Sequence, residues 1–369
     1  MLRALWLWVL LFFLFVTNHG LGRRIVAVGD LHGDLNQTLS ILHLAGLVNK
    51  RQHWIGKDTY FVQLGDILDV GPDDLMIVRL LMRLEKEAQA EGGDVIQILG
   101  NHEIRNLLGD FGAVDPVSLA QSGGKAGRRE LLSNRTPLGI YLRTRRAIFH
   151  HKEFLFMHGG LSTATGNMIT GIKAVEEFNK ALRETLINNT LSPMGKVGVS
   201  LKENEVKKVA NPILVRSILN VRCSELKKVL SKKFHGIKSV VVGHVPHDTD
   251  DFSDWRLCGG RLIAIDFGLS RWKKGDPGHV AALEWDDVSG HVQLMESTGK
   301  FLNYEPDVHS STEHNVKRLL PFIRLAGAVV FLVLLVGLLG KWICSRAMNN
   351  PLSEKQQGGY GSVAPCVTP

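Results

Sequence analysis

The stretch Gly29-Asp30-Leu31-His32-Gly33-Asp34 directly follows residues 25–28, an apolar run rich in β-branched side chains. The run predicts a buried strand, and the stretch after it predicts a turn that carries a carboxylate and an imidazole. Two further segments have the same form: Gly65-Asp66-Ile67-Leu68-Asp69 after residues 60–64, and Gly100-Asn101-His102-Glu103 after residues 95–99.

Two later apolar runs each end in a histidine. Residues 154–157 lead into His158, and residues 239–242 lead into Gly243-His244. One such motif alone would as readily be a helix cap or a turn, because Asp, Asn and Gly favour both. The same arrangement five times in one order is far more specific. It predicts polar side chains gathered at the carboxyl ends of strands in an α/β domain.

The residue types point to a binuclear metal site. Oxygen and imidazole ligands without thiolates are typical of open sites for Mn, Fe or Zn. We expect Asp30 and His32, alternating on an extended strand end, to bind one divalent ion, and Asp66 to bridge it to a second. Two ions about 4 Å apart can polarise a phosphate and acidify a bridging water, so we predict attack by a metal-bridging hydroxide. The expected second-site ligands are Asn101, His158 and His244.

His102 and Asp69 form a predicted acid pair. His102 directly follows the ligand Asn101, so its side chain takes a different direction while staying at the same rim. We expect His102 to protonate the leaving oxygen as the general acid. Asp69 would orient that ring and raise its basicity.

This motif series resembles the phosphoprotein phosphatase family of calcineurin-like metallophosphoesterases, and within it the Shewanella-like protein phosphatases. The likeness covers about residues 24–285 and includes GNHEIRNLLGD (100–110), NPILVRS (211–217) and CGGRLIAIDFGLS (258–270). It implies a two-sheet β-sandwich flanked by α-helices, two divalent metals with Mn first among them, and a phosphoprotein or small phosphoester substrate. By motif match it implies the same metal ligands and acid pair: Asp30, His32, Asp66, Asn101, His158 and His244; His102 and Asp69.

One position departs from the family pattern. The second motif of the family continues Asp-Arg-Gly, whereas this chain has Asp69-Val70-Gly71. The arginine would clamp phosphate oxygens through bidentate hydrogen bonds that valine cannot make. Arg216, which matches another arginine of the subgroup, and Arg105 are the predicted phosphate-binding cations beside Asn101. We expect weaker phosphate binding or a shifted substrate preference.

The motifs are also compatible with two other functions. A diadenosine-polyphosphate hydrolase would share the same ligands and two-metal chemistry. A catalytically weak membrane receptor would keep the fold and signal through its tail. The intact ligand and acid set argues against the receptor, while Val70 argues for it.

The rest of the chain predicts helices over 74–89, 174–187 and 224–233, and strands over 261–265 and 280–285 that close a second sheet. Residues 115–136, polar and rich in glycine, predict an insertion over the site, and residues 291–315 predict one final strand and a stalk. Cys223 and Cys258 could form a disulfide or remain two buried thiols.

Composition and the chain ends bear on location. The formal charge of the 369 residues is +8, but lysines and arginines are dispersed, which predicts a solvated surface and no nucleic-acid partner.

Residues 1–22 resemble a signal peptide, with an uncleaved anchor as the alternative. Residues 325–344 predict one transmembrane helix, so we expect a type I single-pass membrane protein with glycosylation sequons at Asn134 and Asn188. The expected parts are a luminal or extracellular catalytic domain over 23–305, a stalk over 306–324 and a cytoplasmic tail over 345–369.

Overall fold

The computed structural model describes most of one compact unit of the chain. The described residues are 23–161, 169–188, 211–214, 219, 221–246, 255–273, 279–286, 291–297 and 301–304. They belong to the first of two compact units, Met1–Tyr304 and Glu305–Pro369. Within them, no helix is both long and apolar enough to cross a membrane. The predicted signal peptide, stalk, transmembrane helix and tail lie outside the described residues and stay predictions.

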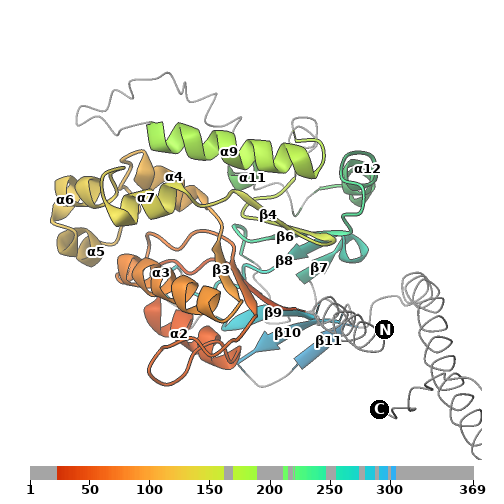
Figure 1. The fold of residues 1–369 in the computed structure, drawn as a ribbon, viewed down its shortest axis with the longest axis horizontal. Coiled ribbons are helices and arrows are strands. Elements are labelled where there is room, and N and C mark those ends of the chain that lie inside the picture. The colour runs from red at the N-terminus through yellow and green to blue at the C-terminus, as the bar shows by residue number, and fades with distance from the viewer. Residues whose placement is uncertain are drawn as a thin grey trace, which may run out of the picture. The chain divides into compact units, whose positions relative to one another are not determined.

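Two β-sheets form the centre of this domain (Figure 1). In the described chain the first sheet has the order β11-β10-β9-β1-β2-β3, and the second has the order β4-β5-β6-β8-β7. Within the first sheet β1, β2 and β3 are parallel, whereas β9 pairs antiparallel with β1. The first-sheet strands are β1 (Arg24–Val28), β2 (Tyr60–Gln63), β3 (Asp94–Gln97), β9 (Ala281–Asp286), β10 (Val292–Glu296) and β11 (Phe301–Tyr304).

The second sheet has a parallel centre with antiparallel edges. Strands β5, β6 and β8 run parallel, while β4 pairs antiparallel with β5 and β7 with β8. Its strands are β4 (Ile148–His151), β5 (Phe154–Met157), β6 (Ser239–Val242), β7 (Arg256–Leu257) and β8 (Leu262–Ala264). The predicted two-sheet α/β architecture is therefore present.

The alternation of side chains along the strands explains why the two sheets pack together. Ile25 and Ala27 of β1 join one buried cluster, which also contains Phe156 of the second sheet. Val26 and Val28 point the other way and join a second cluster with residues of the helices. Because both faces of β1 are buried, its sequence is continuously apolar and does not alternate.

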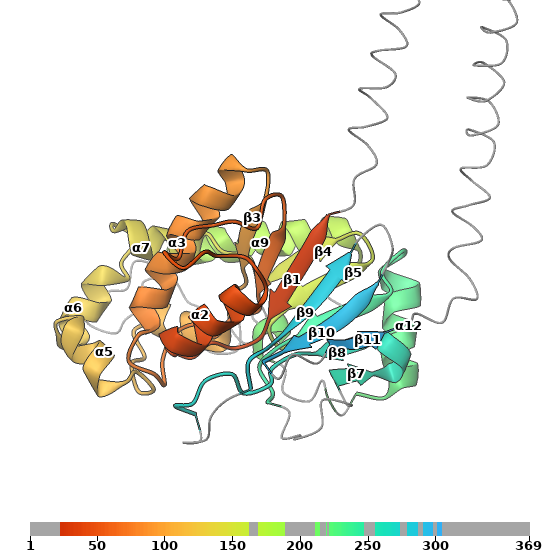
Figure 2. The ribbon, with the colours of Figure 1, turned by 90° about the horizontal axis from the view of Figure 1, so that it is seen from below.

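Helices cover the outer faces of the sheets (Figures 1 and 2). Helix α3 (Asp74–Ala90) packs against β3, and α9 (Ile172–Asn188) packs against β4. Asp34 begins α2 (Leu35–Leu44) by accepting a hydrogen bond from the backbone of Gln37, a normal N-cap. The other helices of the described residues are α4 (Asn101–Leu107), α5 (Pro116–Gln121), α6 (Gly124–Leu131), α7 (Pro137–Arg143), α11 (Asn211–Leu214), α12 (Cys223–Lys233) and the short 3₁₀ turn η3 (Cys258–Gly260).

Two expectations from the sequence need correction. The strand predicted over 280–285 is β9, which lies beside β1 in the first sheet and does not close the second. An apolar run shows that a strand is buried, but it does not encode its neighbour. The final segment contains two strands where one was predicted: β10 and β11 pair with each other. The glycine-rich insertion, whose secondary structure the sequence left undefined, contains helices α5 and α6.

Cys223 and Cys258 form a disulfide with a Cα–Cα distance of 5.1 Å. The bond ties the first residue of α12 to the turn that follows β7 at the edge of the second sheet. It resolves the choice that the sequence left open between a disulfide and two buried thiols.

Candidate metal centre

The predicted ligands meet at the carboxyl ends of the parallel strands. Each follows a different strand, except Asp30 and His32, which both follow β1. The other four follow β2, β3, β5 and β6 in turn. All six side chains are buried: Asp30, His32, Asp66, Asn101, His158 and His244.

Asp66 stands between two groups of ligand atoms. The ligand atoms of His32, Asp66 and His102 lie within 4.8 Å of one another, and so do those of Asp66, His158 and His244. Asp66 Oδ2 lies 3.8 Å from His32 Nε2 and 3.2 Å from His158 Nε2. Asp66 is therefore at the position that the bridging prediction requires.

Asp30 and Asn101 complete the two groups. Asp30 Oδ2 lies 3.6 Å from His32 Nε2, and Asn101 Oδ1 lies 3.2 Å from His158 Nε2. Asp30 Oδ2 is buried and, among the described residues, has no hydrogen-bond partner. A buried carboxylate oxygen without a hydrogen bond is costly unless a cation meets it. The donor set and this oxygen fit divalent metal ions.

The charges of the site also favour cation binding. Burial alone would raise the pKa of Asp66. The neighbouring imidazoles, above all His158 and then His102 and His32, lower it by more and hold the pKa of Asp66 well below its ordinary value. Burial lowers the pKa of His158, yet Asp66 and Asp30 raise it by more, to about 9. Carboxylates that stay ionised inside a protein need compensating positive charge, which imidazolium provides when no metal is bound.

The loops that hold the ligands use backbone conformations that L residues rarely adopt. His32 has a φ of +41°, Asp66 of +54° and His244 of +70°. The expectation that Asp30 and His32 alternate on an extended strand was therefore wrong, because a left-handed turn brings their side chains together. Hydrogen bonds from the backbone of Leu31 (3.0 Å) and His32 (2.9 Å) to Asp66 O hold that turn. Such strain is typical of functional sites.

Glu103 organises these loops, a role that the sequence analysis missed. Its buried carboxylate accepts hydrogen bonds from the backbone N–H groups of Asp66 (2.8 Å), Ile67 (2.9 Å), Leu68 (3.0 Å) and Gly100 (2.7 Å). Burial and the charge of Asp66 raise its pKa. Its place three residues after Gly100, at the N3 position of α4, is the capping-box position that could have identified it.

His102 and Asp69 form the expected pair. His102 Nδ1 lies 2.7 Å from Asp69 Oδ2, and the backbone N–H of His102 donates to Asp66 Oδ1 at 2.9 Å. The other ring nitrogen, Nε2, lies 3.9 Å from Asp66 Oδ2. Burial lowers the pKa of His102, but the hydrogen bond to Asp69 and the charge of Asp66 raise it by more. The ring is thus oriented toward the ligand cluster.

A buried polar network extends behind this pair. Asn106 Nδ2 donates to Asp69 Oδ1 at 2.7 Å, and Arg128 Nε donates to Asn106 Oδ1 at 2.7 Å. Arg128 of α6 is fully buried and forms an ion pair with Asp74 at the start of α3. The helical insertion is therefore attached to the acid pair. Nothing in the local sequence marks Arg128 as buried, because its partners are distant in the chain.

The predicted phosphate-binding residues differ in their placement. Asn101 lies in the ligand cluster, as described above. Arg105 Nε donates to Asp110 Oδ2 at 2.8 Å, so its guanidinium is already paired at the surface. Arg216 lies outside the described residues.

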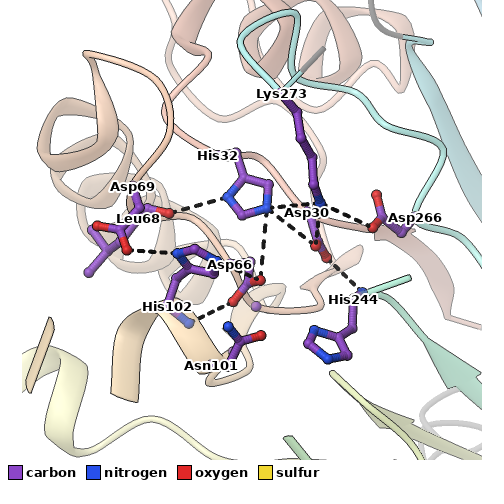
Figure 3. Close-up of polar contacts among 12 residues, drawn as sticks. Asp30, His32, Asp66, Leu68, Asp69, Asn101, His102, His244, Asp266 and Lys273 are labelled. Atoms are coloured by element: carbon purple, nitrogen blue, oxygen red, sulfur yellow. Dashed lines mark hydrogen bonds and ion pairs between the residues drawn. The ribbon is translucent and has the colours of Figure 1, made fainter. Parts of the chain in front are cut away.

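Two further side chains reach the cluster from the segment after β8. Lys273 Nζ lies 3.3 Å from His32 Nε2, and 3.9 Å from both Asp30 Oδ2 and Asp266 Oδ2 (Figure 3). Burial and the neighbouring Asp30 raise the pKa of Asp266 to about 7. The sequence carried a signal for Asp266, because it follows an apolar strand as Asp30 does, but we did not assign it a role.

This fold has counterparts in known proteins. The family model for calcineurin-like phosphoesterases matches residues 23–248. Shewanella-like protein phosphatase 1 of Plasmodium berghei is 28% identical over 275 residues, which cover 72% of this chain and 72% of that relative. Shewanella-like protein phosphatase 2 of Arabidopsis thaliana is 43% identical over 98 residues, or 27% of this chain and 25% of that relative. A crystal structure of a cold-active protein-tyrosine phosphatase from a psychrophilic Shewanella shares the fold, with a TM-score of 0.62 at 22% identity over 78% of this chain and 81% of that one.

Proposed function

The chain belongs to the calcineurin-like phosphoesterase family and is a metal-dependent phosphatase, and we propose that it hydrolyses phosphomonoesters on serine, threonine or tyrosine of phosphoproteins. Its similarity to relatives named as protein phosphatases supports this substrate class. One observation of the site carries the proposal. Asp66 belongs to both ligand groups, and His102 stands beside it with its other nitrogen held by Asp69.

The residues divide into two roles. Asp30, His32 and Asp66 would hold one divalent ion, and Asp66 with Asn101, His158 and His244 the other. Two such ions, with Mn favoured over Fe and Zn, would polarise the phosphate and activate the attacking water. His102 would give a proton to the leaving oxygen. Asp69 would stabilise the ring as an imidazolium, in which Nδ1–H donates to the carboxylate and Nε2–H is free to protonate the leaving oxygen.

The assay that tests this function compares substrates on one preparation. Full-length protein loaded with Mn is given an aryl phosphate, phosphopeptides and diadenosine tetraphosphate. We expect inorganic phosphate from the two monoesters, with a higher kcat/KM than for the dinucleotide. Preferential formation of nucleotide products would support the diadenosine-polyphosphate hydrolase instead. A metal-loaded protein that releases no phosphate from any substrate would support the receptor.

We also propose a type I topology, with the catalytic domain outside the cytosol. The apolar segments 4–16 and 325–344 support it. The Cys223–Cys258 disulfide adds support, because disulfides persist mainly in oxidising compartments. Protease added to sealed microsomes is expected to remove only the tail over 345–369, and digestion of the catalytic domain would overturn the orientation.

A further inference from the structure

We propose that Lys273 is the cation that binds the substrate phosphate in this chain, in the role that an arginine at position 70 would otherwise have. The inference rests on the proposed phosphomonoester substrate. It concerns a residue outside the motifs that point to the metal centre.

The position of the Lys273 ammonium makes it available to an anion. Nζ contacts His32 Nε2 at 3.3 Å, whereas both carboxylates, Asp30 and Asp266, lie at 3.9 Å, beyond hydrogen-bond distance. His32 Nδ1 faces the carbonyl oxygen of Leu68, so Nε2 is the atom that would bind a metal. Metal binding would end its contact with Lys273 and leave the three donors of the ammonium for a ligand at the rim of the cluster. The side chain is 28% exposed, which leaves it accessible from solvent.

The backbone that carries Lys273 is fixed. Arg271 donates from Nε to Asp34 Oδ2 and from its terminal nitrogen to Asp34 Oδ1, both at 2.9 Å. Ser270 Oγ donates to the carbonyl oxygen of His32 at 3.1 Å. Because the anchor is two residues away, the four-carbon stem of Lys273 can reorient while its base stays in place.

The same carbonyl connects this segment to the position of the missing arginine. His32 O also accepts a hydrogen bond from Gly71 N at 3.0 Å, so the Val70 turn and the Lys273 segment meet at one atom. Gly71 approaches this turn so closely that a Cβ there would lie 2.6 Å from His32 O. A cation from the neighbouring segment can therefore serve the part of the site beside Val70.

The other cations described near the site are already paired. Arg105 is bound by Asp110, Arg271 by Asp34, and the buried Arg128 by Asp74. Moving any of these to a phosphate would leave its carboxylate partner without a counter-charge. Among the described residues, Lys273 has only the two longer ion pairs at 3.9 Å, with Asp30 and Asp266.

The test measures phosphate binding separately from turnover. Metal-loaded full-length wild type, Lys273→Met and Lys273→Arg are titrated with inorganic phosphate by calorimetry, and their metal content is measured by mass spectrometry. Because a hydrogen bond to a charged group contributes substantially to the binding free energy, we expect Lys273→Met to weaken phosphate binding about tenfold or more. The KM for an aryl phosphate should rise in parallel. Lys273→Arg should keep most of the affinity, and the metal content should not change.

Lys238→Met is the matched control. Lys238 is also exposed and pairs with Glu153, but it precedes β6, at the edge of the sheet opposite the ligands. Its phosphate affinity should equal that of the wild type. Unchanged phosphate affinity in Lys273→Met, or loss of metal from it, would overturn the inference. Phosphate binding that depends on Lys273 in a protein that cleaves no monoester would refute the proposed function and leave the inference standing.

Discussion

The carboxylate of Asp69 is held at both oxygens: Oδ2 lies 2.7 Å from His102 Nδ1, and Oδ1 accepts a 2.7 Å hydrogen bond from Asn106. Asp69 itself is fully buried, so its orientation is fixed from two sides. The pair is therefore oriented before a substrate arrives, which is what efficient proton transfer requires.

Replacement of His102 should affect substrates according to their leaving group. We expect His102→Asn to lower kcat roughly a hundredfold for alkyl phosphates, since general acid catalysis contributes about that factor. Aryl phosphates with acidic leaving groups need little protonation and should lose much less, while metal content stays the same. His53→Asn, which removes a surface partner of Glu87, is the control and should have wild-type kinetics. Equal losses for both substrate classes would count against the acid role.

Removal of Arg128 should destabilise the fold strongly. Arg128→Met leaves the buried Asp74 without its partner, and breaking a buried pair from one side costs about 3–5 kcal/mol of unfolding free energy. Arg135→Met, in the same insertion, breaks an exposed pair with Glu130 and should cost about 1 kcal/mol or less. Urea unfolding of the two variants measures the difference. Similar small losses for both would mean that the network contributes little to stability.

Val70→Arg tests whether the missing arginine limits phosphate affinity. The bidentate hydrogen bonds of a restored guanidinium contribute about 1.5–3 kcal/mol to the free energy of phosphate binding. Inhibition by inorganic phosphate should therefore tighten about tenfold or more. The control is Val70→Gly, which adds no charge and suits the left-handed φ of +71° at this position. An unchanged or weaker inhibition constant for Val70→Arg would mean that the missing arginine does not limit phosphate affinity, as expected if Lys273 already fills its place beside Val70.

Metal binding should strengthen as the pH rises. In the metal-free protein the pKa of His158 is raised to about 9, since Asp66 and Asp30 outweigh the effect of burial. Below that pKa the ring carries a proton that a metal must displace, so binding releases protons at pH 7 and becomes tighter toward pH 9. Calorimetric titration with Mn in two buffers of different ionisation enthalpy measures the proton release. Equal heats in both buffers would contradict this prediction.

The sequence predicted the parts of the site that are encoded locally. Strands β1, β2 and β3 are short apolar runs, and the ligands directly follow them, so Asp30, Asp66 and Asn101 could be predicted from position alone. The pairing of His102 with Asp69 could be expected because both belong to the same set of motifs. The family resemblance added the two-sheet arrangement.

Contacts between distant segments could not be predicted in this way. Arg128 and Lys273 look like ordinary surface cations in the sequence, and only the folded chain brings them to Asp74 and His32. The left-handed φ of His32 is likewise imposed by hydrogen bonds to the Asp66 loop. These interactions depend on tertiary structure, which local patterns of residue type do not specify.

Asp66 provides the most direct test of the central claim, because it is the residue shared by both ligand groups. The measurement is the metal content of purified wild type and Asp66→Asn after loading with Mn, with phosphate release from an aryl phosphate recorded on the same samples. We predict about two equivalents of metal in the wild type, fewer in Asp66→Asn, and no activity in the variant, since the bridging negative charge is lost. Two full equivalents of metal in Asp66→Asn would contradict the bridging role and the binuclear site built on it.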